Sequence, residues 1–463
     1  MISASHALRS SLPERRLHGE ELLRDLERRF RNSRDALERA HLADRLVPEL
    51  VSVAQPERAA QVLANIGELV PDPDARARLS ALRGVVRAMA GESPADDLAA
   101  ALALLPAIPG PTQAVVRQRA GVASAYSRDA LGCEEHSLAA LTLCDRYGMR
   151  GLGSRAAGVL YGLYYHLTGD LQAARYYAEL ATSLADSSGD TTTRRSFLVA
   201  QYDLACVFAD WDRAGSLREL IRRDRLPEPV PARLPTRIGD ALMFGQRGDF
   251  NAMRAHLEAT LSAEVQPIDR AFVMALHALA LAGLGCKSEA NPVARQALAL
   301  SNMHQNRDEM LHLAIRRKLA GVLAAWASVV VGDAYHGMRA LGVRSKWPGS
   351  TGTLAAALES EARGSAFDTQ NPSIAQVRGY LIVAQRARLG NLALEAAVPF
   401  SLTQTEVDVL RAVAQGKSNA AIALERGVTR NAVERRLMSA YEKLDVKTRG
   451  EAIAKISRLL RPE

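Results

Sequence analysis

Breaks between helices recur along this chain at a nearly constant interval, and this feature limits the possible folds more than any other. The breaks fall at residues 54–56, 91–92, 132–133, 169–170, 209–210, 248–249, 285–286 and 332–333, so that the intervals are 37, 41, 37, 40, 39, 37 and 47 residues. Between the breaks the sequence has the periodicity of amphipathic helices. A period of about 39 residues predicts one helix pair per repeat, and such pairs stack into a solenoid with an extended concave surface.

The composition agrees with packed helices. The chain has 463 residues, of which 48% are hydrophobic and only 5% aromatic, and alanine is abundant. Alanine has the highest helix propensity, whereas sheets favour aromatic and β-branched residues. We therefore expect an all-α fold with enough apolar residues for more than one core.

Two of the repeats carry a recognisable turn and second helix. The segments are GDLQAARYYAELATSLA from Gly169 and GDFNAMRAHLEATLS from Gly248, with the small residue Ala174 at the expected helix contact. This pattern resembles the tetratricopeptide repeat, although the period here is longer. The resemblance implies a sensor or interaction domain over residues 18–341, which follows a basic lead-in at residues 1–17. The helical pattern becomes irregular at residues 342–400, which we expect to form an end-cap and linker. Within this region a turn-rich segment at residues 342–353 and a loop at residues 362–373 are expected to precede two short helices.

One repeat is unusually rich in tyrosine. Two interpretations remain open: the rings fill the seam between two helices, or they line a pocket for a small effector or peptide, because tyrosine offers a large contact area and a hydroxyl group. The candidate pocket residues are Tyr161, Tyr164, Tyr165, Tyr176 and Tyr177.

The segment from Lys417 to Leu444 predicts a helix-turn-helix. A short helix over residues 419–426 ends at Gly427, which can take the left-handed conformation of a tight turn. A second helix follows Thr429, whose hydroxyl group can cap its first turn. In a helix-turn-helix the second helix lies in the major groove of DNA.

The second helix has one apolar face and one polar face. Its apolar stripe, spaced at +4, +3 and +4, consists of Val433, Leu437, Ala440 and Leu444. The opposite face carries Asn431, Arg435 and Met438, and Glu434 lies beside it; these four residues are the predicted base contacts. Side chains beside that face or at helix starts are predicted to contact the DNA backbone: Ser418, Asn419, Thr429, Arg430, Arg436, Lys443 and Arg449.

Residues 402–453 resemble the LuxR-type helix-turn-helix domain, a module of four helices. The matching positions include Leu402, Thr403, Glu406, Val409, Leu410, Gly416, Ser418, Asn419, Ile422, Ala423, Gly427, Val433, Lys443, Leu444, Val446, Arg449, Glu451 and Ala452. Independently of the family, Thr403 and Glu406 have the spacing of a capping box. The resemblance implies a DNA-binding domain at residues 401–463 with double-stranded DNA as its partner.

The chain departs from the family pattern in its recognition helix. Where the family has T-V-K-x-H, this chain reads Ala432 to Arg436 as AVERR, and Thr405 replaces an arginine of the opening motif. These changes leave two hypotheses. One is a transcriptional regulator, and the other is a helical-repeat interaction scaffold whose terminal module no longer binds DNA.

The last helix is predicted to pair two copies of the chain. Its apolar residues are Ala452, Ile453, Ile456 and Leu460, and look-alike domains pair through this helix. A homodimer would place two recognition helices about 34 Å apart on an inverted repeat. The alternatives are packing of Ile456 and Leu460 beneath the linker, and pairing through the solenoid.

The motifs that the sequence lacks limit the possible functions. Larger regulators resembling the maltose activator add an ATPase module, but this chain has no G-x-x-x-x-G-K-[ST] loop. We find no enzyme motif and expect no cofactor and no metal. An activator is the commoner outcome among look-alikes, and RNA polymerase is one partner that an activator of this kind would have; the effector is unknown.

Charge and cysteine usage suit a cytoplasmic DNA-binding protein. The net charge is +8, and residues 401–463 carry twelve basic and eight acidic side chains, so that +4 of it lies there. The cysteines, Cys133, Cys144, Cys206 and Cys286, have no metal or redox spacing and are expected to be reduced and buried, with a redox switch as the alternative. No targeting segment or bilayer-spanning run is expected.

Overall fold

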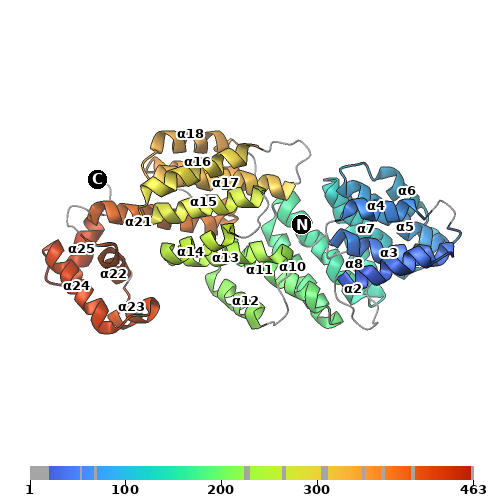
Figure 1. Ribbon diagram of the computed structural model, residues 1–463, viewed down its shortest axis with the longest axis horizontal. Helices are drawn as coiled ribbons and strands as arrows, with labels where there is room; N and C mark the ends of the chain where they lie inside the picture. The colour runs from blue at the N-terminus through green and yellow to red at the C-terminus, as the bar shows by residue number, and fades with distance from the viewer. Residues whose placement is uncertain are drawn as a thin grey trace. The chain divides into compact units, whose positions relative to one another are not determined.

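The computed structural model describes residues 20–52, 55–66, 70–223, 230–262, 267–303, 311–346, 350–365, 371–397, 402–414 and 416–459. Within these ranges every regular element is a helix, which confirms the all-α class (Figure 1). None of these helices is long and apolar enough to cross a membrane. The basic lead-in predicted at residues 1–17 lies outside the described residues.

The chain divides into two compact units. The first comprises Met1–Gly239 and Gln305–Ile315, and the second comprises Asp240–His304 and Arg316–Glu463. The helices that lie wholly in the first unit are α2 (Glu20–Asn32), α3 (Ala36–Ser52), α4 (Pro56–Ala64), α5 (Pro73–Met89), α6 (Ala95–Ala103), η1 (Leu105–Ala107), α7 (Gly110–Tyr126), α8 (Ala130–Arg146), α9 (Arg150–Gly162), η2 (Leu163–Thr168), α10 (Leu171–Ser188), α11 (Thr191–Val207) and α12 (Trp211–Arg223).

Another set of helices lies wholly in the second unit. They are α14 (Phe250–Leu261), α15 (Pro267–Gly283), α16 (Lys287–Met303), α18 (Ala334–Ser345), α19 (Ser350–Ala362), α20 (Pro372–Ala375), α21 (Arg378–Ala397), α22 (Gln404–Ala414), α23 (Asn419–Arg426), α24 (Arg430–Leu444) and α25 (Arg449–Leu459). Two further helices, α13 (Val230–Gln246) and α17 (Leu311–Val330), have residues in both units.

Neighbouring helices of the first unit pack in the manner of repeated helix pairs. Each of α7 to α11 contacts the next helix along the chain, and α7 also contacts α5 and α9, while α9 contacts α11. Contacts between alternate helices are those that stacked pairs make. The arrangement is compatible with the predicted solenoid.

Most of the predicted breaks are confirmed by backbone geometry. Gly169 and Gly248 have φ values of 74° and are followed by Asp170 and Asp249, whose carboxylates cap the next helix. The break predicted at residues 132–133 is wrong, because these residues lie inside α8. The left-handed residue there is Arg128, with φ 63°, so the turn does not use the glycine that the sequence offers.

The region predicted to be irregular is more helical than expected. Much of the turn-rich segment 342–353 belongs to α18 or α19, and α21 extends over 20 residues where short helices were expected. Ser350, Thr351 and Thr353 stand in the first turn of α19, where their polarity is tolerated, and Ser345 is the last residue of α18. The predicted loop at residues 362–373 partly lies outside the described residues.

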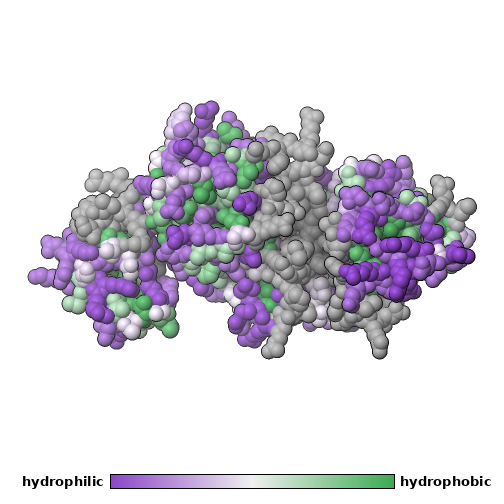
Figure 2. Space-filling model, in the orientation of Figure 1, coloured by the Kyte–Doolittle hydropathy of each residue, from purple (hydrophilic) through white to green (hydrophobic). Residues whose placement is uncertain are grey.

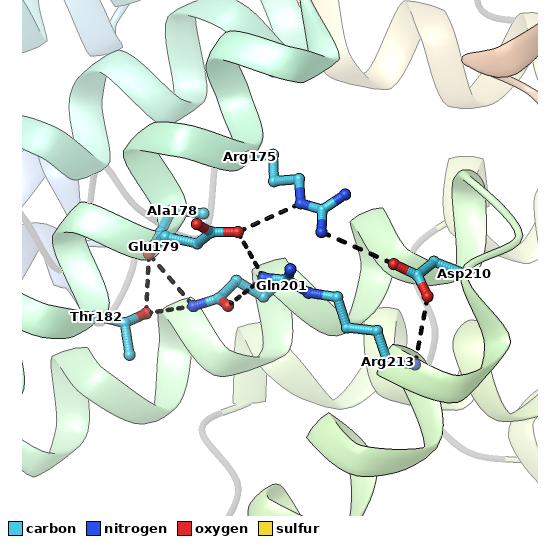
Figure 3. A network of polar contacts seen from close by, with 7 residues as sticks. All are labelled: Arg175, Ala178, Glu179, Thr182, Gln201, Asp210 and Arg213. Carbon is cyan, nitrogen blue, oxygen red and sulfur yellow. Dashed lines mark hydrogen bonds and ion pairs between the residues drawn. The ribbon is translucent and has the colours of Figure 1, made fainter.

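A polar network connects α10, α11 and α12 in the first unit (Figure 3). The Glu179 carboxylate accepts from Arg175 Nε at 3.3 Å and from Arg213 Nη2 at 2.5 Å. Arg213 also donates to Gln201 Oε1 at 3.3 Å, and Arg175 lies 3.8 Å from the Asp210 carboxylate. Three consecutive helices are therefore joined by side chains as well as by apolar packing.

In the second unit, α21 is held firmly and leads to the last four helices. The fully buried Trp326 of α17 donates its indole N–H to the Ala384 carbonyl at 2.9 Å, and Asn391 Nδ2 donates to the Val330 carbonyl at the same distance. Backbones approach closely where α21 crosses α15, at Gly390 and Gly283. This packing fixes the helix from which the C-terminal module continues.

Replacement of Gly390 by alanine is expected to destabilise the second unit by about 1 kcal/mol or more. A Cβ atom at this position would lie 2.7 Å from the Gly283 carbonyl oxygen, and backbone atoms cannot move aside as a flexible side chain can. The matched control is Gly215→Ala on α12, where an added Cβ meets nothing within 4 Å and alanine should raise helix stability. Urea unfolding followed by circular dichroism measures both; equal midpoints for the two variants would contradict the close approach.

Candidate nucleic-acid interface

The last four described helices share one apolar core. The stripe predicted on α24 is buried, with Val433, Ala440 and Leu444 at 0% exposure and Leu437 at 4%. These side chains pack with apolar residues of the other three helices, namely Val409, Leu410, Ala412, Val413, Ile422, Ala423 and Ala452. The face of α24 opposite this stripe is consequently left for solvent or a partner.

Local capping explains where the two helices of the turn begin and end. The Ser418 hydroxyl accepts from the Ala421 amide at 3.2 Å and starts α23, which ends at Gly427 with φ 62°. The Thr429 hydroxyl accepts from the Ala432 amide at 3.2 Å and starts α24. The predicted helix-turn-helix geometry is confirmed, and both hydroxyl groups serve as helix caps.

The capping box at the start of α22 is also confirmed and extends into a larger network. The Thr403 amide donates to Glu406 Oε2 at 2.7 Å, and the Glu406 amide donates to Thr403 Oγ1 at 3.3 Å. The same carboxylate accepts from Ser439 Oγ at 2.7 Å and from Lys443 Nζ at 2.8 and 2.9 Å. Glu406 thus connects α22 to the recognition helix.

This network decides the ionisation of Glu406. Burial alone would raise the pKa of this carboxyl, which is 5% exposed, but the hydrogen bonds from Lys443, Ser439 and Thr403 outweigh burial and lower the pKa to about 2. Glu406 is therefore ionised at neutral pH. Lys443 was predicted to contact the DNA backbone; any phosphate contact would share its ammonium with Glu406.

The residues predicted to read bases lie on the solvent side of α24. Asn431 and Arg435 are exposed, and Met438 is 64% exposed. Glu434 is paired with Arg430, whose Nε lies 2.7 Å from the carboxylate, and this hydrogen bond lowers the pKa of Glu434. Arg435 makes no ion pair with any residue in the described part of the chain, so its guanidinium is available to a ligand.

The other residues predicted to contact the DNA backbone lie in different environments. The guanidinium of Arg449 donates to Asn419 Oδ1 at 3.1 Å and to the Lys417 carbonyl, so both predicted residues take part in holding α25 against the start of α23. Arg436 is half-exposed beside the solvent face. Arg430 and Arg436 are thus the basic residues of α24 that flank its solvent face, on which Arg435 stands.

The helix predicted to form the dimer contributes first to the module's own core. Ala452 has 0% exposure, and Ile453 is partly buried against the same core. Ala452 therefore offers no surface to a partner in this conformation. The side chains of Ile456 and Leu460 lie outside the described residues.

The tyrosines predicted to form an effector pocket pack against one another in the first unit. Tyr161 stacks on Tyr165 with ring centroids 5.5 Å apart, and Tyr164 stacks on Tyr177 at 5.4 Å. Tyr176 meets Tyr177 edge to face at 5.0 Å and is 60% exposed. Four of the five rings are at least partly buried between helices, an arrangement that favours the seam interpretation.

Two of the phenolic hydroxyl groups are also occupied. Tyr165 Oη donates to Asp203 Oδ2 at 2.6 Å, and Tyr164 Oη donates to Glu134. Tyr164 and Tyr165 lie in η2, a segment of π-helix, which is rare. The hydroxyl groups therefore join neighbouring helices.

Three of the cysteines are buried as expected, and Cys286 is half-buried. Burial raises the pKa of Cys133 and of Cys144 to about 12 in each case. Both thiols are consequently protonated at neutral pH and poor nucleophiles.

A compact set of four helices, with a capped tight turn and a second helix that buries one face and exposes the other, defines a helix-turn-helix module of the DNA-binding class. Residues 400–456 match the family described as bacterial regulatory proteins, luxR family. The C-terminal part of this chain is thus a LuxR-type helix-turn-helix domain. No curated protein matches the chain.

Sequence reasoning missed the ion pairs that hold this domain together. Besides Glu406 and Lys443, Asp408 pairs with Arg426 at 3.3 Å, and Lys417 pairs with Glu425 at 2.6 Å. Glu406 and Lys443 are 37 residues apart in the sequence, a separation that no local spacing rule can detect.

Proposed function

We propose that this protein is a transcriptional regulator that binds double-stranded DNA through α24. The observation that carries the proposal is the solvent face of α24, where Asn431, Arg435 and Met438 stand opposite a fully buried stripe in a LuxR-type domain. An arginine can make two hydrogen bonds to guanine and an asparagine two to adenine, and Met438 can contact a thymine methyl group. Arg435 is the principal base-reading residue in this proposal.

Backbone contacts supply the remaining affinity. Arg430 and Arg436 flank the reading face, and their charges would replace counterions on phosphates. The proposed active form is a homodimer on an inverted-repeat site, because a single recognition helix binds weakly. The helical repeats would sense a small ligand, a peptide or a protein partner and pass the signal to the module, with activation as the proposed outcome.

The alternative function is an interaction scaffold whose terminal module binds protein. One observation favours it: Leu424 on α23 is 86% exposed and Met438 is 64% exposed, so apolar side chains stand on both helices of the turn. Figure 2 shows a mixture of hydrophilic and apolar residues on the visible face of this domain. DNA binding by the purified protein separates the two functions.

The phosphate role of Arg436 is tested by salt dependence. We expect Arg436→Ala to reduce the slope of log affinity against log salt by about 0.9, because one phosphate contact is lost. The preference among DNA sequences should stay unchanged, since a phosphate contact carries no base information. Titrations at several salt concentrations measure the slope, with Arg339→Ala on α18 as the control; an unchanged slope for Arg436→Ala removes this residue from the backbone contacts.

A further inference from the structure

A cavity of about 300 Å³ in the second unit is lined by both the helical repeats and the DNA-binding module. It is bounded by the turn between α13 and α14, the end of α15, and the helices α22 and α23. Its lining residues that matter here are Arg247, Asp249, Asp408, Arg411, Lys417, Glu425 and Arg426. The volume falls at the lower end of the range for small-molecule sites, which is about 300–1,000 Å³.

The cavity has more cationic than anionic side chains. Four basic residues and three acidic residues line it, so its formal charge is 4 − 3 = +1. The carboxylates are already engaged. Asp408 pairs with Arg411 at 3.7 Å and with Arg426 at 3.3 Å, while the Glu425 carboxylate accepts from Lys417.

The third carboxylate, that of Asp249, caps the helix that follows it. Asp249 accepts from the Ala252 amide at 3.0 Å and caps α14, whose first two residues, Phe250 and Asn251, also line the cavity. On the same side Arg247 is exposed and makes no ion pair within the described part of the chain. A guanidinium without an ion pair in the described residues therefore lines the cavity beside the capped start of α14, and its positive charge favours an anion.

A hydrogen bond beside the cavity joins the module to α21. Arg411 of α22 donates to the Gly390 carbonyl of α21 at 3.1 Å, and burial lowers the pKa of this guanidinium. An anion in the cavity would offer acceptors to Arg247 from the repeats and to Arg426 or Arg411 from the module. Its binding would add charge-assisted hydrogen bonds between the turn that precedes α14 and the DNA-binding module.

We propose that this cavity is the effector site and that it takes a small organic anion carrying a carboxylate or phosphate group. The bound anion bridges the repeats and the DNA-binding module and so changes the freedom of α24 to reach DNA. The regulation of DNA binding by the anion rests on the proposed function, whereas binding of the anion to the cavity does not. This site is separate from the tyrosine cluster, in which Tyr164 and Tyr165 donate their hydroxyl groups to carboxylates.

The test is calorimetric titration of the full-length protein without DNA. Citrate and inorganic phosphate are titrated separately into the protein, each against chloride at the same ionic strength, so that the two arms distinguish a carboxylate from a phosphate. We expect saturable binding of at least one of them at one site per chain. Arg247→Ala should weaken that binding about tenfold, the loss expected for one charge-assisted hydrogen bond.

The control is Arg339→Ala on α18, an exposed arginine that does not line the cavity and should leave the affinity unchanged. Arg426→Ala provides a second variant on the module side and should also weaken binding. The proposal is overturned if neither anion binds saturably, or if Arg247→Ala binds as the unmodified protein does. The titration contains no DNA, so a negative result would not bear on the proposed DNA binding. Equally, a negative DNA-binding result would not change the measured anion affinity.

Discussion

Replacement of Arg435 by alanine is expected to weaken binding to a specific DNA site by about 1–3 kcal/mol, which is roughly a 5- to 150-fold loss, and to change binding to random DNA little. Arg435 is exposed on the face of α24 opposite the buried stripe, and no ion pair within the described residues competes for its guanidinium. A bidentate contact to guanine depends on the base, so its loss appears only on the specific site.

Fluorescence anisotropy measures this effect on two duplexes, one selected from random DNA by the protein and one with the same bases scrambled. Arg436→Ala is the matched control, since loss of a phosphate contact weakens binding to both duplexes equally. If Arg435→Ala also weakened both duplexes equally, Arg435 would be a phosphate contact and base reading would fall to Asn431.

Replacement of Glu406 by alanine should have the largest effect on the stability of the DNA-binding module, about 3–5 kcal/mol. The substitution leaves Lys443 and Ser439 without their acceptor and removes the capping box at Thr403. Hydrogen exchange of the amides of α22 to α25 in the full-length protein reports the local stability. Glu442→Gln, an exposed change on α24, is the control and should leave exchange unchanged.

The pH dependence of the same module follows from Glu406. Its folded pKa, about 2, lies below the ordinary value of 4.5, so the folded state favours the ionised form. The resulting stabilisation, on the order of 3 kcal/mol, is complete above pH 4.5 and is lost as the pH falls from 4.5 towards 2. The Glu406→Gln variant should lack this pH-dependent stabilisation. If the stability of the variant fell between pH 4.5 and pH 2 as that of the unmodified protein does, the network would not stabilise the module.

The features that sequence reasoning found are those set by neighbouring residues. Ser418, Gly427 and Thr429 act within four residues of the groups they cap, so the limits of α23 and the start of α24 could be predicted. The break at Gly132 could not be located, because the turn is made by Arg128 in a left-handed conformation that sequence gives no reason to expect.

The features that it missed depend on packing over long distances along the chain. The Glu406 to Lys443 pair, and the cavity that Arg247 shares with Arg426, exist only once helices far apart in sequence lie together. The tyrosines show the converse. Their clustering in sequence left open a seam between helices and a binding pocket. In the structure Tyr164 and Tyr165 donate their hydroxyl groups to neighbouring carboxylates, which favours the seam.

The most direct test of the central claim is a footprint of the purified full-length protein on fragments of the genome from which it comes. The account predicts a discrete set of protected sites sharing one inverted-repeat sequence, lost with Arg435→Ala and retained with Glu442→Gln. Absence of discrete protection, or the same protected sites with Arg435→Ala, would contradict a regulator that reads DNA through α24.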